Sequence, residues 1–386
     1  MLLSLAVYIL LALTLFALGW HARQRDDVRQ AHGLPHLPFY CWEVLTAIGV
    51  IALIFGVRYE TGSDHIMYLE QYFNMCNHGT VVREGGIESG FSLITKLIAT
   101  LKCHFTIYFG FWALLQAVLL YWGVRHRKLV LPWLGLLLIL GPYSINWFSF
   151  LRQWVVTFGC VAMVPWVANR KFWPYLAGVL LLSTIHYSAF LLLPVYFLPF
   201  ERISLLSRKK LLAIYAVCFL LGLYPVWIKA FGFLTDLVSW VGYERYSAML
   251  ANLLSGDFHR PSFGPMRLIA IYTQVIAIWY YPQLRASRPN DRLLPVFFAF
   301  SLLASCFETL FINTAHYMVR PADLFYVCLL IVVAYTADYL YERKQFARLA
   351  LCLIPILLYV PITVVKSYYF PGEMSTVTNY HFFMWR

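Results

Sequence analysis

Charged residues are scarce in this sequence. Asp, Glu, Lys and Arg make up 12% of its 386 residues, whereas hydrophobic residues make up 61%. Soluble domains carry about 25% charged residues, so this composition argues against a soluble protein. Lipid admits only helices and closed barrels, and the apolar runs are far longer than barrel strands. The composition therefore predicts an all-α polytopic membrane protein, with one transmembrane domain over residues 1–386.

The sequence also lacks the short motifs of several common catalytic sites. It contains no DxD, no P-loop, no GxSxG, no HExxH and no CxxC pair. These absences argue against a nucleotide-sugar enzyme with a metal clamp and against an ATP-driven pump. We therefore expect no metal and no other cofactor.

About twelve membrane-spanning segments are predicted. The first, residues 2–20, lacks a basic n-region and a small-residue cleavage site, so we interpret it as a span and not as a removed signal peptide. The remaining predicted spans cover residues 37–57, 105–123, 129–146, 150–168, 173–185, 187–199, 211–231, 265–281, 293–312, 317–338 and 349–367.

Lys and Arg concentrate in every second loop, which places those loops in the cytoplasm and both termini outside. This topology accounts for most of the net charge of +12, so we expect no nucleic-acid partner. It also requires residues 173–199 to form two short helices that meet at His186. Broken backbone is tolerated at membrane depth where it lines a water-filled cavity, so His186 is expected at a corner open to the outside.

Two predicted outer loops are long, at residues 58–104 and 232–264, and loops of this length usually carry function. Helical periodicity within the first loop predicts helices lying along the membrane surface. Cys76 and Cys103 share this loop. They form either a disulfide or two free thiols, because pairing cannot be read from the sequence.

The stretch from Arg58 to Tyr68 reads RYETGSDHIMY and follows the second span. Gly62 permits a turn, and Asp64 and Tyr68 lie four residues apart on one helical face. Arg58 is a candidate phosphate ligand, Asp64 a candidate base and Tyr68 a candidate substrate contact. The alternative is an interfacial anchor that contains an Arg58–Asp64 ion pair.

Arg152 and Gln153 begin the predicted span 150–168 at its outer end. A guanidinium beside a helix N-terminus forms an anion site suited to phosphate, and Gln153 is a candidate substrate contact. The alternative is an arginine that extends to the lipid headgroups.

His186, Tyr187 and Ser188 follow at the predicted helix break. A neutral histidine can take a proton from a sugar hydroxyl near neutral pH, with Tyr187 and Ser188 as substrate contacts. The alternative is a hydrogen-bonded histidine that only holds the break in place.

Tyr317 and Arg320 lie at the predicted outer start of span 317–338, with Arg320 in its first turn just before Pro321. Arg152 and Arg320 together suit a pyrophosphate, and Glu308 is a candidate counter-ion for them. Tyr317 is a candidate substrate contact. The alternative for Arg320 is again a cation that extends to the headgroups.

These motifs, in this order, resemble the EpsG-like family of exopolysaccharide polymerases, which is related in role to the Wzy-type O-antigen polymerases. The matching patterns are R-Y-x-x-G-x-D-x-x-x-Y at Arg58, Glu88 in ESGF, R-Q at Arg152, H-x-S-A at His186, and a late arginine at Arg320. The sequence departs from the family at His65, where an aromatic residue is usual, and at Glu60, where an apolar residue is expected. These departures concern sugar specificity.

The resemblance implies a GT-C-like glycosyltransferase in the bacterial inner membrane, with its active site facing the periplasm. A growing glycan would leave its polyprenyl pyrophosphate and join a hydroxyl of a second lipid-linked repeat unit. The base would be Asp64, Glu88 or His186. The partners implied are the lipid-linked donor and acceptor, the bilayer and a chain-length regulator.

Two other functions are compatible with these sequence features. A flippase for lipid-linked sugars would also have many spans and cavity arginines, but its cations should line a path that reaches both leaflets. A membrane O-acetyltransferase would also use a histidine, but it would need access for a cytoplasmic acyl donor.

Overall fold

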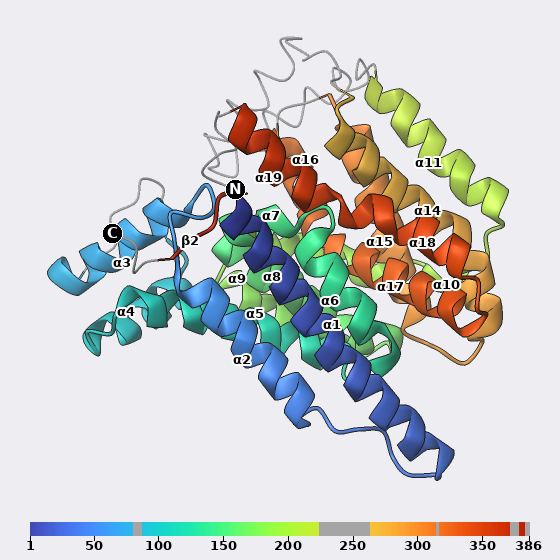
Figure 1. Cartoon of the computed structure of the whole chain (residues 1–386), viewed down its shortest axis with the longest axis horizontal. Coiled ribbons are helices and arrows are strands. Elements are labelled where there is room, and N and C mark those ends of the chain that lie inside the picture. Colours follow the sequence, from blue (N-terminus) through green and yellow to red (C-terminus); the bar gives the residue numbers. More distant parts are fainter. Residues whose placement is uncertain (80–86, 224–262, 314–315, 371–377, 383–386) are drawn as a thin grey trace.

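The structure is a computed structural model, and it describes residues 1–79, 87–223, 263–313, 316–370 and 378–382, except for the side chains of residues 316 and 317. Nearly all of this part of the chain is helical, as predicted. The helices pack into one bundle in which most run side by side (Figure 1).

Among the described residues, four helical stretches are long and apolar enough to cross a membrane: α1 (Leu2–Ala31), α5 (Phe105–Gly123), α8 (Leu151–Ala168) and the pair α18–α19 (Phe346–Tyr369). Shorter apolar helices include α2 (Trp42–Gly56), α9 (Phe172–Ser183) and α15 (Leu294–Leu310). Within the apolar 18-residue segment of each helix, 78% of α8 is buried inside the protein, whereas only 33% of α1 is buried. Helix α8 is therefore a core element, whereas much of α1 is available to lipid.

Several predicted spans are broken in the structure. Residues 129–146 form η1 (Lys128–Val130) and α6 (Leu131–Leu140), and a turn then leads into α7 (Ser144–Ser149). In that turn Tyr143 has a φ of 75°, in the left-handed region. Gly141 and Pro142 precede it and end the helix.

The segment around His186 is broken as predicted. Helix α9 ends at Ser183, and residues 187–199 form the 3₁₀ helices η2 (Tyr187–Leu192) and η3 (Pro194–Phe197) instead of a second α-helix.

The prediction for Arg320 was wrong in detail. Residues 317–338 form two helices, α16 (His316–Asp323) and α17 (Tyr326–Glu342). Arg320 lies in the last turn of α16, and Pro321 lies inside this helix. Pro321 removes one backbone donor, and the helix ends two residues later.

Helix α10 (Phe200–Ser204) was not predicted and lies in the basic loop between the predicted spans 187–199 and 211–231. The remaining helices overlap predicted spans: α11 (Arg208–Leu223), α14 (Pro265–Ser287), which runs six residues past its predicted end, α18 (Phe346–Leu357) and α19 (Tyr359–Tyr369). Residues 224–231 of the predicted span 211–231, and all but two residues of the predicted loop 232–264, lie outside the described residues.

The first long loop contains the predicted helices, α3 (His65–His78) and α4 (Ser89–Thr100). It also contains a strand that was not predicted, β1 (Arg58–Tyr59), which pairs with β2 (His381–Phe382) in antiparallel register. Helices α3 and α4 lie at the end of the bundle that holds β2 and the N-terminus (Figure 1). Cys76 and Cys103 are both free thiols.

Ion pairs cross-link the opposite end of the bundle. Arg127 donates two hydrogen bonds of 2.8 Å to Asp291, which also accepts one of 2.8 Å from Tyr335. Arg23 of α1 and Arg288 both pair with Asp338 of α17. The Arg23–Asp338 pair joins the N-terminal helix α1 to α17 at the predicted cytoplasmic end.

Candidate active site

Glu88 joins Arg152 and His186, and we call these three residues the Glu88 cluster. Arg152 Nη1 donates to Oε2 of Glu88, and His186 Nδ1 lies 2.8 Å from Oε1. The backbone N–H of Tyr187 also points at Oε1, at 3.4 Å. Glu88 and Arg152 are only 4% and 5% exposed. Arg152 and His186 lie 64 and 98 positions after Glu88 in the sequence. These three predicted site residues therefore form one contiguous unit in the structure.

A glycine contact brings Glu88 to the helix break. Glu88 precedes α4, and the N–H groups of Gly90 and Phe91 donate to the carbonyl oxygen of Thr184 at 2.9 and 3.1 Å. A Cβ atom at Gly90 would lie 2.3 Å from Oγ1 of Thr184. The start of α4 can therefore dock on the end of α9 only without a side chain at this position, and docking places Glu88 beside His186.

Arg152 occupies the first turn of α8, as predicted. Its guanidinium lies 5.1 Å from the ring centre of Phe91 and 5.9 Å from that of Tyr68, and its Nε is 3.5 Å from the Tyr68 hydroxyl. The anion at this helix N-terminus is the Glu88 carboxylate. Because each buried charge compensates the other, loss of either one alone would be costly.

Gln153 connects α8 to α16. Its Nε2 donates to the carbonyl oxygen of Arg320 at 2.9 Å and to Oδ2 of Asp323 at 3.1 Å. Thr157 Oγ1 donates to the carbonyl oxygen of Asp323 at 3.1 Å. The amide nitrogen that we expected to contact substrate is therefore committed to holding α16 against α8.

Arg320 is exposed, and its guanidinium lies 5.0 Å from the ring centre of Phe150. Within the described residues it forms no hydrogen bond and no ion pair through this guanidinium. Asp64 lies within electrostatic range of both Arg320 and Arg152. Burial raises the pKa of Asp64, while the hydroxyl of Ser63 and these two arginines oppose the rise. Arg320 is thus a cation available to a ligand, next to a partly buried carboxylate.

Arg58 faces aromatic rings rather than Asp64. Its guanidinium lies 5.3 Å from the ring centres of Phe55 and Phe148, and burial lowers its pKa to about 10, which leaves it charged at neutral pH. No Arg58–Asp64 ion pair occurs in the part of the chain that the structure describes. His65 stacks on Phe109 with ring centres 4.3 Å apart, and burial lowers its pKa to about 3.

Glu308 is not the counter-ion of Arg152, because Glu88 takes that place. Glu308 Oε2 instead accepts from the Tyr143 hydroxyl at 2.8 Å and from Gln274 Nε2 at 2.6 Å. Asp323 lies within electrostatic range of both Glu308 and Arg320. Asp323 was not among the predicted site residues, although a carboxylate inside a predicted span is a functional candidate because burying its charge in the membrane is costly.

The remaining predicted contacts lie at the edge of the cluster. Tyr187 is 51% exposed beside His186. Ser188 Oγ is buried without a hydrogen-bond partner among the described residues. Tyr317 belongs to α16, but its side chain lies outside the described part of the structure.

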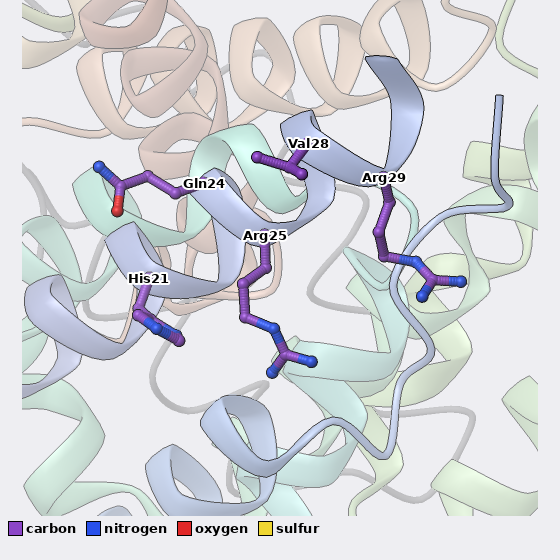
Figure 2. A pocket seen from close by; sticks show the side chains of 5 residues that line it. All are labelled: His21, Gln24, Arg25, Val28 and Arg29. Carbon is purple, nitrogen blue, oxygen red and sulfur yellow. The ribbon is translucent and has the colours of Figure 1, made fainter. Parts of the chain in front are cut away.

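A surface hollow of about 310 Å³ lies elsewhere, on the predicted cytoplasmic part of α1. Figure 2 shows the side chains of His21, Arg25 and Arg29 extending from the same side of this helix. His21 and Arg25 both bind Glu43, at 2.8 and 2.7 Å, and Arg29 donates to the carbonyl oxygen of Pro35. These cations are engaged within the protein, so this hollow is not a second anion site.

Comparison with known families gives one match: the model of the EpsG family covers residues 42–382. The chain belongs to the EpsG family. Searches among curated proteins and solved structures gave no match. As an EpsG-family member with long apolar helices, the chain is a multi-pass membrane protein with a polysaccharide-polymerase-like, glycosyltransferase-like role. The matched region includes the Glu88 cluster, Asp64 and Arg320.

Proposed function

We propose that this EpsG-family protein is a polysaccharide polymerase with a GT-C-like architecture in the bacterial inner membrane. It transfers a growing glycan from polyprenyl pyrophosphate to a hydroxyl of a lipid-linked repeat unit on the periplasmic face. The single observation that carries this proposal is the Glu88 cluster, with the unpaired Arg320 beside it. A base, its orienting carboxylate and two guanidinium groups are what this transfer needs.

The geometry favours His186 as the base. Oε2 of Glu88 accepts from Arg152 and Oε1 faces Nδ1 of His186, so a neutral His186 that donates to Glu88 carries its hydrogen on Nδ1. This tautomer leaves the lone pair on Nε2. The imidazole is 27% exposed, so a substrate hydroxyl can reach it. Glu88 itself is a poor base, because both of its oxygens already accept hydrogen bonds.

In the proposed step, the acceptor hydroxyl gives its proton to His186 Nε2 while its oxygen attacks the anomeric carbon of the donor glycan. The bond from that carbon to the pyrophosphate oxygen breaks, and the leaving group keeps the electron pair. Preorganised positive charge stabilises this developing anion. Arg320 contributes an exposed guanidinium that forms no ion pair among the described residues, and Arg152 contributes a guanidinium held in place by Glu88. No cofactor is needed, because the pyrophosphate-linked donor is already activated.

The test is an assay of purified protein with lipid-linked repeat units, read out by glycan length. Wild-type protein should make longer glycans, whereas unchanged glycans would favour a flippase and acylated glycans an O-acetyltransferase. His186→Gln keeps a hydrogen bond but cannot act as the base, so its rate should fall by about 10²–10⁴-fold. Full activity of this variant would reduce His186 to a structural element and shift the base to Asp64, which Asp64→Asn then tests.

A further inference from the structure

Glu308 lies at the centre of a second polar site. Tyr215 donates to Gln274 Oε1 at 2.7 Å, which fixes the amide orientation so that Gln274 Nε2 points at Glu308. The same Nε2 lies 3.1 Å from the Tyr143 hydroxyl, so this hydroxyl accepts from Gln274 and donates to Glu308 Oε2. Gln274 of α14 and Tyr143 of the turn before α7 thus donate to one carboxylate oxygen of α15, and Tyr215 of α11 orients Gln274.

This carboxylate has capacity for further donors. Tyr143 and Gln274 donate to Oε2, and the Tyr326 hydroxyl is a third hydrogen-bond partner of Glu308, whereas an ionised carboxylate can accept about four hydrogen bonds. Glu308 is partly exposed. Arg267 lies within electrostatic range but, among the described residues, no cation forms an ion pair with Glu308. A carboxylate at this depth is expensive, and internal contacts satisfy only part of it.

The surroundings of Glu308 suit an uncharged, hydroxyl-rich ligand. A phosphate would be repelled by Glu308 and by the neighbouring Asp323, and it has Arg152 and Arg320 as better partners. A sugar hydroxyl can donate to the acceptor position that remains on this carboxylate. Tyr143 and Tyr326 are buried and stack on each other beside it, with ring centres 3.6 Å apart, which holds the carboxylate in place.

Helix α16 connects this site to the Glu88 cluster. Asp323 accepts from Gln153, the neighbour of Arg152, and lies within electrostatic range of Glu308. Anion-binding and hydroxyl-binding groups therefore occupy neighbouring regions, joined by one short helix.

We propose that Glu308, with Tyr143 and Gln274, forms a saccharide-binding site that takes hydroxyl groups of the lipid-linked glycan. This inference rests on the proposed polymerase function and identifies where the uncharged part of its substrate binds. The pyrophosphate and the saccharide then bind to separate groups, which orients the substrate between them.

The test uses a probe without lipid or phosphate: the free oligosaccharide released by mild acid from repeat units of cells that lack this protein. Binding to the full-length protein is measured by calorimetry. Glu308→Gln should weaken binding at least ten-fold, because it removes the charge from the acceptor. Glu201→Gln is the matched control, since Glu201 is a 60% exposed carboxylate paired with Arg170, and it should bind like the wild type.

Tyr143→Phe serves as the second variant if Glu308→Gln does not fold. It removes one donor to Glu308 and should weaken binding about three-fold. Wild-type affinity in either folded variant would overturn the proposal. Polymer synthesis by a wild-type protein that binds no free oligosaccharide would also overturn it, while leaving the polymerase function intact. Binding that Glu308→Gln abolishes, without any polymer synthesis, would support the saccharide site and refute the polymerase.

Discussion

The Glu88–Arg152 pair allows a quantitative test of the buried cluster. We compare Glu88→Gln, Arg152→Gln and the double variant with the wild type. The two side chains are 5% and 6% exposed, so solvent screens the pair little. Breaking a buried pair by removing one partner costs about 3–5 kcal/mol, whereas removing both partners is close to neutral.

These energies convert to measurable shifts in the thermal midpoint. At the per-residue unfolding entropy of globular proteins, a chain of 386 residues loses roughly 1.2 °C per kcal/mol. Each single variant should therefore unfold about 4–6 °C below the wild type. The double variant should unfold above both single variants, because it leaves no uncompensated charge.

Tryptophan fluorescence during a temperature ramp in detergent provides the assay. His186→Gln is the control, because it leaves the Glu88–Arg152 pair intact and should shift the midpoint by much less. A double variant whose loss equals the sum of the two single losses would refute the reasoning. The two charges would then act independently, and the compensation that we infer from their contact would be absent.

Four further outcomes are expected. Arg320→Ala should abolish polymer synthesis at an unchanged thermal midpoint, because the guanidinium of Arg320 is exposed and unpaired. Arg320→Lys should recover little activity, because an ammonium group lacks the planar fork of a guanidinium. Normal synthesis by the Ala variant would leave Arg320 as a lipid anchor. Gly62→Ala should lower the midpoint, because Gly62 has a φ of +100° and an added Cβ would lie 2.2 Å from the carbonyl oxygen of Phe148. Burial lowers the pKa of His65 to about 3, so acidification protonates this histidine first in the unfolded chain, and the free energy of unfolding should fall by on the order of 2 kcal/mol at pH 5. When thermal midpoints are compared at pH 7.5 and pH 5, His65→Phe should lack this part of the loss. Equal losses in both proteins would contradict the burial argument. Cysteines introduced at residues 204–207 should resist an impermeant thiol reagent added outside intact cells, and labelling would invert the predicted topology.

The helical membrane class was predictable because it depends on composition and on the length of apolar runs, which are properties of local sequence. The break at His186 was predictable because the positive-inside rule fails without it. Helix breaks that do not change the side of the membrane on which a basic loop lies were not predicted. The turn at Tyr143 and the interruption between α16 and α17 belong to this kind.

The site was predictable in its members but not in its contacts. Arg152, His186 and Glu88 were chosen separately, by helix position, by cost at membrane depth and by resemblance. The contact of the Glu88 carboxylate with both Arg152 and His186 depends on the docking of Gly90 against Thr184. No local sequence pattern encodes this docking. Arg58 was predicted as a phosphate ligand from its charge, but its guanidinium packs against aromatic rings.

The pairing of β1 with β2 has a consequence for biosynthesis. Thr61 Oγ1 donates to the carbonyl oxygen of Asn379, 318 positions later, and His381 and Phe382 pair with the strand just before the Asp64 loop. A nascent chain inserts its helices into the membrane in order, so this loop receives its last tether only when residues 378–382 leave the ribosome. Translation products that end before residue 378 lack these contacts. In such fragments the loop that contains Asp64 is not held in place by β2.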